Sequence, residues 1–337
     1  MKRLALFLCA ASAYGAITGT VVNRSTGKPQ AGATVVLNLL AQQGITMIDQ
    51  AKSDAQGKFT INQDPPPGGP SLLRTAFDGV TYNHMMPPGS PTTGITVDVY
   101  NASADPGAAK VSKHMLLFEP AGGQMVVNET YLYTNTGTTA WNDSDKGTLH
   151  FYLPTSAAGK VQVNATAPGG MPIPAAVAKS GKPDIFGVIF AIKPGETRFD
   201  LTYTVPYNPG DDYSGKIVTK DDNTYLIAPN GITLAGDHLG DLGVEPRTQA
   251  HIWGLQGNSY SIKLTGTEAA PPTADAAQGD SSDSGPQIEQ IMPRLYSKSK
   301  LILGLAFGIL AIGFALLYRA PQATASPAKE SNERGRG

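Results

Sequence analysis

The chain has 337 residues, a length that suggests two domains with accessory segments. Only 16% of the residues are charged, whereas 38 are glycine and 26 are proline, a composition typical of short strands joined by many turns. The formal net charge is -1 and no basic patch carries interleaved aromatic residues, which argues against nucleic-acid binding. The one cysteine, Cys9, lies in an apolar N-terminal run, so the chain beyond it has no thiol for a disulfide, a metal site or a nucleophile.

Residues 1–15 have the pattern of a secretory signal peptide. Lys2 and Arg3 precede an apolar run of about ten residues, and small residues follow from Ala11 onward. The run is too short to cross a bilayer, which takes about 20 apolar residues. We therefore expect residues 1–15 to be removed after export.

Residues 16–102 predict a first antiparallel β-sandwich. Its strand-like runs are separated by turns rich in proline, glycine and aspartate, and they read AITGTVV, ATVVLNLL, GKFTIN, SLLRTAF and GITVDVY. The last run alternates, with Ile95, Val97 and Val99 on one face. Phe59 is the expected core anchor of this unit, and no segment has a helical period.

Three turn motifs in this unit occur in the order found in the carboxypeptidase regulatory-like domain, which residues 17–101 resemble. The motifs lie in GTVVNRSTGKPQAGATVVL, SDAQGKFTI and PPPGGPSLL. The matching residues are Gly19, Thr26, Gly27, Pro29, Gly32, Ala33, Asp54, Gly57, Phe59, Pro66, Pro67 and Gly68. The resemblance implies a transthyretin-like β-sandwich, an accessory module of a bacterial membrane-anchored protein, in which Ser71 and Leu72 replace the family's usual ending of the third motif. Gly27 and Gly57 should adopt positive φ, and Gly32 should allow close packing.

Residues 105–264 predict a second β-sandwich, immunoglobulin-like or related, with roughly eight strands. Two runs alternate so that their large apolar side chains share one face. In TLHFYL these are Leu149, Phe151 and Leu153, and in TRFDLTYTV they are Phe199, Leu201, Tyr203 and Val205. The run IFGVIFAI at 185–192 is apolar throughout and predicts a central strand.

The remaining chain predicts a membrane anchor. Residues 265–297 read as an acidic linker rich in proline, alanine and serine. Residues 298–319 contain an uncharged apolar stretch long enough for one transmembrane helix, and residues 320–337 form a short polar tail. With an exported N-terminus, this order places the ectodomain outside the cytoplasm, on the periplasmic side of a bacterial inner membrane or at the cell surface, and the tail in the cytoplasm. Small residues share one face of the predicted helix, which favours self-association as a hypothesis; they are Gly304, Gly308, Ala311 and Ala315.

No catalytic motif occurs in the sequence. None of the five histidines is followed three residues later by glutamate, and there is no Gly-x-Ser-x-Gly, P-loop or dinucleotide fingerprint. The sequence therefore predicts neither an enzyme nor a cofactor.

Four groups of polar residues remain as candidate ligand sites. The glycine-rich loop at 236–245 holds Asp237, His238 and Asp241 as candidate metal ligands, with a plain connecting loop as the alternative. Imidazole and thioether groups at His84 and His114, each followed by methionine, would suit copper if the chain brought them together. The favoured alternative is that the histidines are surface residues and the methionines fill gaps in the core. Asp143 and Asp145 form a fragment of a calcium loop or a polar turn, and the acidic pairs at 211–212 and 221–222 could share a cation or lie in solvated loops.

These observations favour a non-catalytic binding or scaffolding protein outside the cytoplasm, tethered to the membrane, with a protein or a glycan as its ligand. The alternative is a metal-handling or hydrolytic protein with a site near His238 and Asp241.

Overall fold

The computed structural model describes residues 16–41, 44–65, 69–219 and 224–270. The predicted signal peptide, nearly all of the linker, the predicted membrane helix and the tail lie outside these residues, as do residues 66–68 and the acidic pair at 221–222. The described part is built from β-strands, together with one three-residue 3-10 turn. No helix within it is long and apolar enough to cross a membrane.

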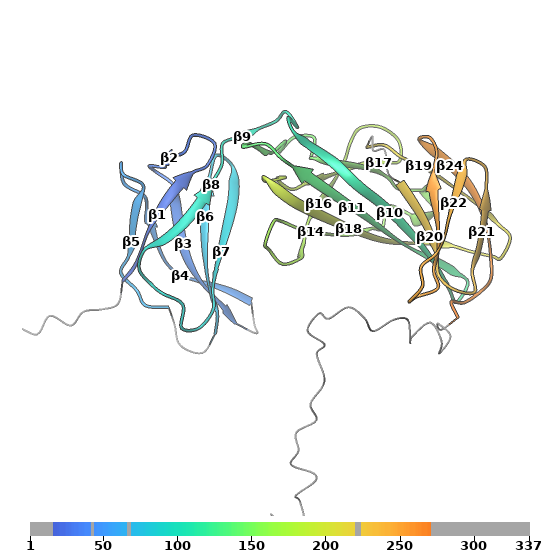
Figure 1. Ribbon diagram of the computed structural model, residues 1–337, viewed down its shortest axis with the longest axis horizontal. Helices are drawn as coiled ribbons and strands as arrows, with labels where there is room; N and C mark the ends of the chain where they lie inside the picture. The colour runs from blue at the N-terminus through green and yellow to red at the C-terminus, as the bar shows by residue number, and fades with distance from the viewer. Residues whose placement is uncertain (1–15, 42–43, 66–68, 220–223, 271–337) are drawn as a thin grey trace, which may run out of the picture. The chain divides into compact units, whose positions relative to one another are not determined.

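Eight strands form the first sandwich, seen in blue to cyan in Figure 1. They are β1 (Ile17–Asn23), β2 (Lys28–Pro29), β3 (Thr34–Ala41), β4 (Gly44–Lys52), β5 (Lys58–Ile61), β6 (Ser71–Phe77), β7 (Val80–Met86) and β8 (Ile95–Val99). One four-stranded sheet has the order β2–β1–β5 with β8 beside β1, and the other has the order β4–β3–β6–β7. The predicted inward residues Ile95, Val97 and Val99 are buried in the core between the two sheets, and so is Phe59, as expected.

Glycines in the turn motifs of this sandwich have different physical roles. Gly27 and Gly57 adopt φ of 70° and 73°, as the turn motifs predict. The expected close packing at Gly32 is wrong, because a Cβ there would meet nothing within 4 Å; its φ of 73° is what favours glycine. Close approach occurs instead at Gly19, where a Cβ would clash with the carbonyl oxygen of Ile95.

The second sandwich consists of three sheets that share one core. Its elements, with the β9–β12 pair, are β9 (Ala102–Ser103), β10 (Ala109–Ala121), β11 (Gln124–Asn135), β12 (Ala140–Trp141), β13 (Leu149–Tyr152), η1 (Thr155–Ala157), β14 (Gln162–Thr166), β15 (Ile173–Pro174), β16 (Ala176–Lys179), β17 (Ile185–Ile189), β18 (Gly195–Pro206), β19 (Asp212–Lys216), β20 (Thr224–Ala228), β21 (Thr233–Gly236), β22 (Leu239–Val244), β23 (His251–Leu255) and β24 (Ser259–Thr265). The large sheet has the order β15–β14–β18–β11–β10–β20–β23–β22, and two three-stranded sheets, β13–β17–β16 and β19–β24–β21, complete the core.

Alternation along the long strands builds this core. Every second residue of β11 and β18 is buried, which confirms the inward face predicted for Phe199, Leu201, Tyr203 and Val205. The apolar segment at 185–192 contains β17, which is the middle strand of its three-stranded sheet, as predicted.

The strand pairing is mixed, although we expected only antiparallel sandwiches. β8 runs parallel to β1, β20 runs parallel to β10, and the short strands β9 and β12 are also parallel. Each of these partners is separated from the other by a long stretch of chain, and such connections allow a strand to return in the same direction.

Candidate functional site

An apolar cleft of about 470 Å³ lies between the outer face of the β4–β3–β6–β7 sheet and the second sandwich. This volume is within the range of about 300–1,000 Å³ found for small-molecule sites. Two hydrogen bonds join its walls near the start of β7: Asn142 Nδ2 donates to the carbonyl of Gly79, and Lys193 Nζ donates to the carbonyl of Thr81.

The first wall is a row of cross-strand apolar pairs on the side of the sheet that faces away from its own core. Leu40 pairs with Ile45 at the β3–β4 end, and Leu72 pairs with Met85 between β6 and β7. The neighbouring residue Leu73 points to the opposite side and is buried in the core of the first sandwich. An outer sheet face of a soluble sandwich is normally polar, so this row requires another explanation.

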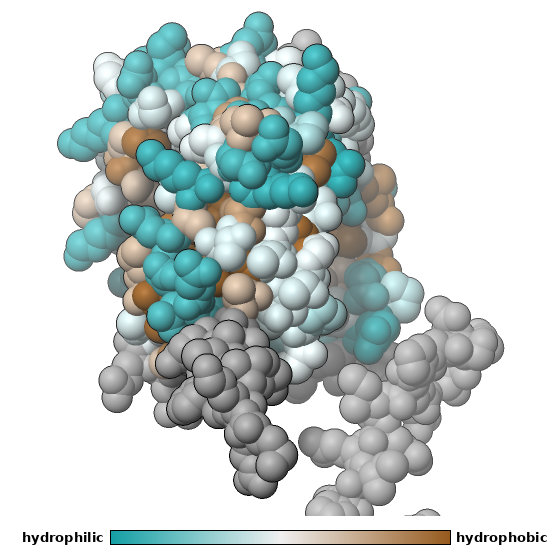
Figure 2. Space-filling view, turned by 90° about the vertical axis from the view of Figure 1, so that its left-hand side faces the viewer, coloured by the Kyte–Doolittle hydropathy of each residue, from teal (hydrophilic) through white to brown (hydrophobic). Residues whose placement is uncertain are grey.

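The second wall comes from the segment that ends at β15 and from the end of β17. Met171, Ile173 and Ile189 line it, together with Phe190. The described residues contain ten exposed large hydrophobic side chains, and five of them border this cleft: Ile45, Met85, Met171, Ile173 and Ile189, which are between 38% and 61% exposed. In contrast, hydrophilic side chains predominate on the face shown in Figure 2, where hydrophobic atoms form small separate patches. Exposed apolar surface gathered in one concave place is typical of a binding site.

Two cations and no carboxylate line the cleft among the described residues. Lys193 Nζ lies 4.9 Å from the centroid of the Tyr82 ring, and burial lowers the pKa of this lysine to about 8. Arg74 on β6 pairs across the sheet with Asn83 on β7. The cleft therefore combines apolar walls with positive charge at the β6–β7 edge.

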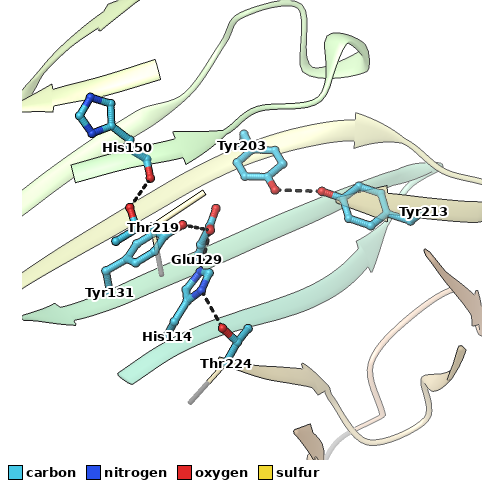
Figure 3. Close-up of polar contacts among 8 residues, drawn as sticks. All are labelled: His114, Glu129, Tyr131, His150, Tyr203, Tyr213, Thr219 and Thr224. Carbon is cyan, nitrogen blue, oxygen red and sulfur yellow. Dashed lines mark hydrogen bonds and ion pairs between the residues drawn. The ribbon is translucent and has the colours of Figure 1, made fainter. Parts of the chain in front are cut away.

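A second polar feature is a buried cluster in the core of the second sandwich, drawn in Figure 3. His114 Nε2 lies 2.7 Å from Glu129 Oε1, and the Tyr131 hydroxyl donates to the same oxygen at 2.5 Å. His114 Nδ1 lies 3.2 Å from Thr224 Oγ1, and the imidazole stacks on the Tyr131 ring at 3.9 Å. The His114 and Glu129 side chains are 0% and 4% exposed. Because a carboxylate can only accept, His114 Nε2 donates this hydrogen bond.

A β-bulge puts His114 into the core. The pairing of β10 with β11 shifts between Val111 and Lys113, so that one extra residue is inserted on β10. Val111 is buried before the shift, whereas His114 and Leu116 are buried after it. Without the bulge, the alternation from Val111 would turn His114 outward.

Tyrosine hydroxyls extend the polar character of this core. The hydroxyls of Tyr203 and Tyr213 are 2.9 Å apart, as Figure 3 shows. Burial is the main cause that raises the pKa of Tyr131 and Tyr203, and the nearby Glu129 carboxylate raises both further. These phenols stay protonated at neutral pH, and the cluster is a hydrogen-bonded part of the buried core.

Among the metal candidates of the 236–245 loop, Asp241 has a partner outside the loop. Asp241 Oδ1 lies 2.6 Å from His251 Nε2, which lowers the pKa of Asp241, and the His251 ring stacks on Trp253. His238 sits in the turn between β21 and β22 with φ of 63°, and Asp237 is in the same turn. The sequence therefore pointed to Asp241 but missed its partner, His251.

The other candidates have structural surroundings. His84 lies on β7 opposite Leu73, whereas His114 belongs to the buried cluster. Asp143 Oδ1 accepts the backbone N–H groups of Asp145 and Lys146, which lowers its pKa and forms a polar turn. Across the described ranges, no group of three or more His, Cys, Asp or Glu side chains could hold a metal ion.

The acidic pair at 211–212 also takes part in local contacts. Asp211 Oδ2 accepts hydrogen bonds from the backbone and the side chain of Asn208, and Asp212 lies 3.9 Å from Lys263 Nζ.

Comparison with known proteins adds little to this description. No family model matches the chain, and no curated protein matches it. A crystal structure of an M1 zinc metallopeptidase from Deinococcus radiodurans, bound to a Tyr-Ser-Ala substrate, matches with a TM-score of 0.26 and 11% identity. The match covers 47% of this chain and 42% of that one, and a likeness this distant carries no argument about fold or activity.

Proposed function

We propose that this protein is a non-catalytic binding or scaffolding protein, and that the apolar cleft is its binding site. The observation that carries the proposal is that half of the exposed large hydrophobic side chains in the described residues border one cleft. Burial of such surface by a ligand stabilises a complex by about 25 cal/mol per Å² of apolar area, before the costs of association are subtracted. The apolar walls favour an apolar ligand, such as a segment of a protein, over a glycan.

The proposal keeps the architecture predicted from the sequence. The first sandwich would be a transthyretin-like, carboxypeptidase regulatory-like module, and the second an immunoglobulin-like or related one. Residues 298–319 would anchor the ectodomain outside the cytoplasm, and the small residues from Gly304 to Ala315 would allow two anchors to associate. A protease or hydrolase function has less support. The cluster of His114 and Glu129 is buried, and Asp241 and His251 form only a two-residue pair at the surface.

The test uses a neutral apolar dye, Nile red, and the full chain in lipid nanodiscs. Trp141 is the chain neighbour of the cleft residue Asn142, so energy transfer from Trp141 reports dye near the cleft. Subtracting the signal of a Trp141→Phe variant removes dye that is dissolved in lipid.

We expect Met85→Ser with Ile189→Ser to weaken dye binding at least fivefold, because both side chains lie in the walls. Leu242→Ser is the control, since Leu242 is also an exposed large hydrophobic residue, on β22, but does not line the cleft. Equal loss in the two variants, or no transfer from Trp141 at all, would refute the assignment of the cleft as the binding site.

A further inference from the structure

We infer that the ligand of the cleft is an aliphatic chain that ends in a carboxylate, such as a long-chain fatty acid. The inference rests on the proposed function, because it specifies what the apolar cleft binds. It is carried by the juxtaposition of Arg74 and Lys193 with walls that are otherwise apolar and contain no acidic side chain among the described residues.

Arg74 and Lys193 each have a partner on the same stretch of β7. Lys193 donates to the carbonyl of Thr81, and Arg74 pairs with Asn83, two residues further along the strand. Two residues of a strand span about 6.6 Å, a separation that two long side chains can close around one carboxylate. Among the described residues, no carboxylate forms an ion pair with Arg74 or Lys193, so the positive charge of both is available to a ligand.

The donors needed for a carboxylate are present. An ammonium group carries three N–H donors, of which the carbonyl of Thr81 takes one. The guanidinium of Arg74 offers a planar pair of donors that matches a carboxylate. A partly dehydrated lysine beside an aromatic ring gains more from an incoming anion than one in bulk water does.

The rest of the ligand would lie on the apolar walls. Leu72 and Met85 continue the β6–β7 edge away from Arg74, and Met171 and Ile173 face the cleft from the second sandwich. Methionine side chains are unbranched and adapt their shape to a flexible chain, which suits an aliphatic ligand of variable length. A sugar would leave its own hydroxyl groups without hydrogen-bond partners on these walls.

The test compares 11-(dansylamino)undecanoate with its methyl ester, which has the same chain but no charge. Binding to the full chain in nanodiscs is followed by energy transfer from Trp141 to dansyl, again with the Trp141→Phe variant subtracted. We expect the acid to bind at least tenfold more tightly than the ester. Arg74→Gln and Lys193→Gln should each remove most of this preference, whereas Lys113→Gln, which replaces an exposed lysine outside the cleft, should leave it unchanged.

The outcomes separate this inference from the proposed function. If the acid and the ester bind equally well to the wild-type chain, the carboxylate assignment is wrong, while the cleft remains a binding site. If neither binds near Trp141, both proposals fail. Displacement of the acid by an amidated apolar hexapeptide at a lower concentration than unlabelled undecanoate would overturn the assignment in favour of a peptide ligand.

Discussion

Replacing Glu129 with methionine removes the carboxylate at the centre of the buried cluster. His114 Nε2 and the Tyr131 hydroxyl, which lie 2.7 and 2.5 Å from Glu129 Oε1, lose this acceptor. A buried polar group that loses its hydrogen-bond partner costs about 1–3 kcal/mol, so the two groups together cost about 2–6 kcal/mol. Methionine is similar in shape to glutamate, so the variant adds little from a new cavity. We expect the free energy of unfolding of the second sandwich to fall by about 2–6 kcal/mol.

The measurement is urea denaturation of the full chain followed by tryptophan fluorescence. Both tryptophans of the protein, Trp141 and Trp253, pack in or against the core of the second sandwich, so the signal reports that core. The same loss of stability should lower its melting temperature by about 4–24 °C.

The control for this prediction is a triple variant with His114→Phe, Glu129→Met and Tyr131→Phe. It keeps the stacked pair of rings but removes the groups that lose a partner in the single variant. Replacing all partners of buried hydrogen bonds by apolar groups of similar shape is often nearly neutral or stabilising, so the triple variant should regain most of the lost stability. If it is as unstable as Glu129→Met alone, the cost comes from packing, and the reasoning from lost partners is refuted.

Two further predictions concern the first sandwich and the cleft. Gly19→Ala should destabilise the first sandwich by about 1–3 kcal/mol, because its Cβ would meet the Ile95 carbonyl oxygen and the Phe59 ring. In a Trp141→Phe background, circular dichroism should show this loss while the fluorescence of Trp253, in the second core, does not change, and an unchanged melt would contradict the prediction. Acid binding in the cleft should weaken as the pH rises through about 8, because Lys193 is charged only below its lowered pKa, while Arg74 stays protonated and the pKa of Tyr82 is raised to about 12. A titration of dansylundecanoate affinity from pH 6 to 10 checks this, and Lys193→Gln should make the affinity independent of pH over that range.

Alternation and turn chemistry predicted the parts of the fold that depend on local sequence. Phe59 and the inward residues of β8 and β18 could be assigned because one face of each strand is buried and the other is not. β4 and β7 were not predicted, because they place apolar residues such as Ile45 and Met85 on the outer face of their sheet. That pattern becomes clear only once the opposite wall of the cleft is known.

The polar sites were harder to predict for a related reason. The cluster of His114 and Glu129 depends on a bulge that reverses the alternation within β10, and no local signal in the sequence marks it. The pair of Asp241 and His251 depends on the register of the β22–β23 hairpin, which also contains an irregularity. In both cases tertiary pairing, and not residue type, decides which groups meet.

The parallel pairing of β10 with β20 has a consequence for how the protein is made. His114 lies opposite Thr224, and 110 residues separate them in the chain. At a synthesis rate of about 5–20 residues per second, this edge of β10 stays open for about 5–20 s after β10 has emerged. During that interval His114 and Glu129 still have access to water, where neither group carries a desolvation cost. Arrival of β20 closes the edge and encloses the cluster, so the late strand completes both the sheet and the dehydration of its polar core.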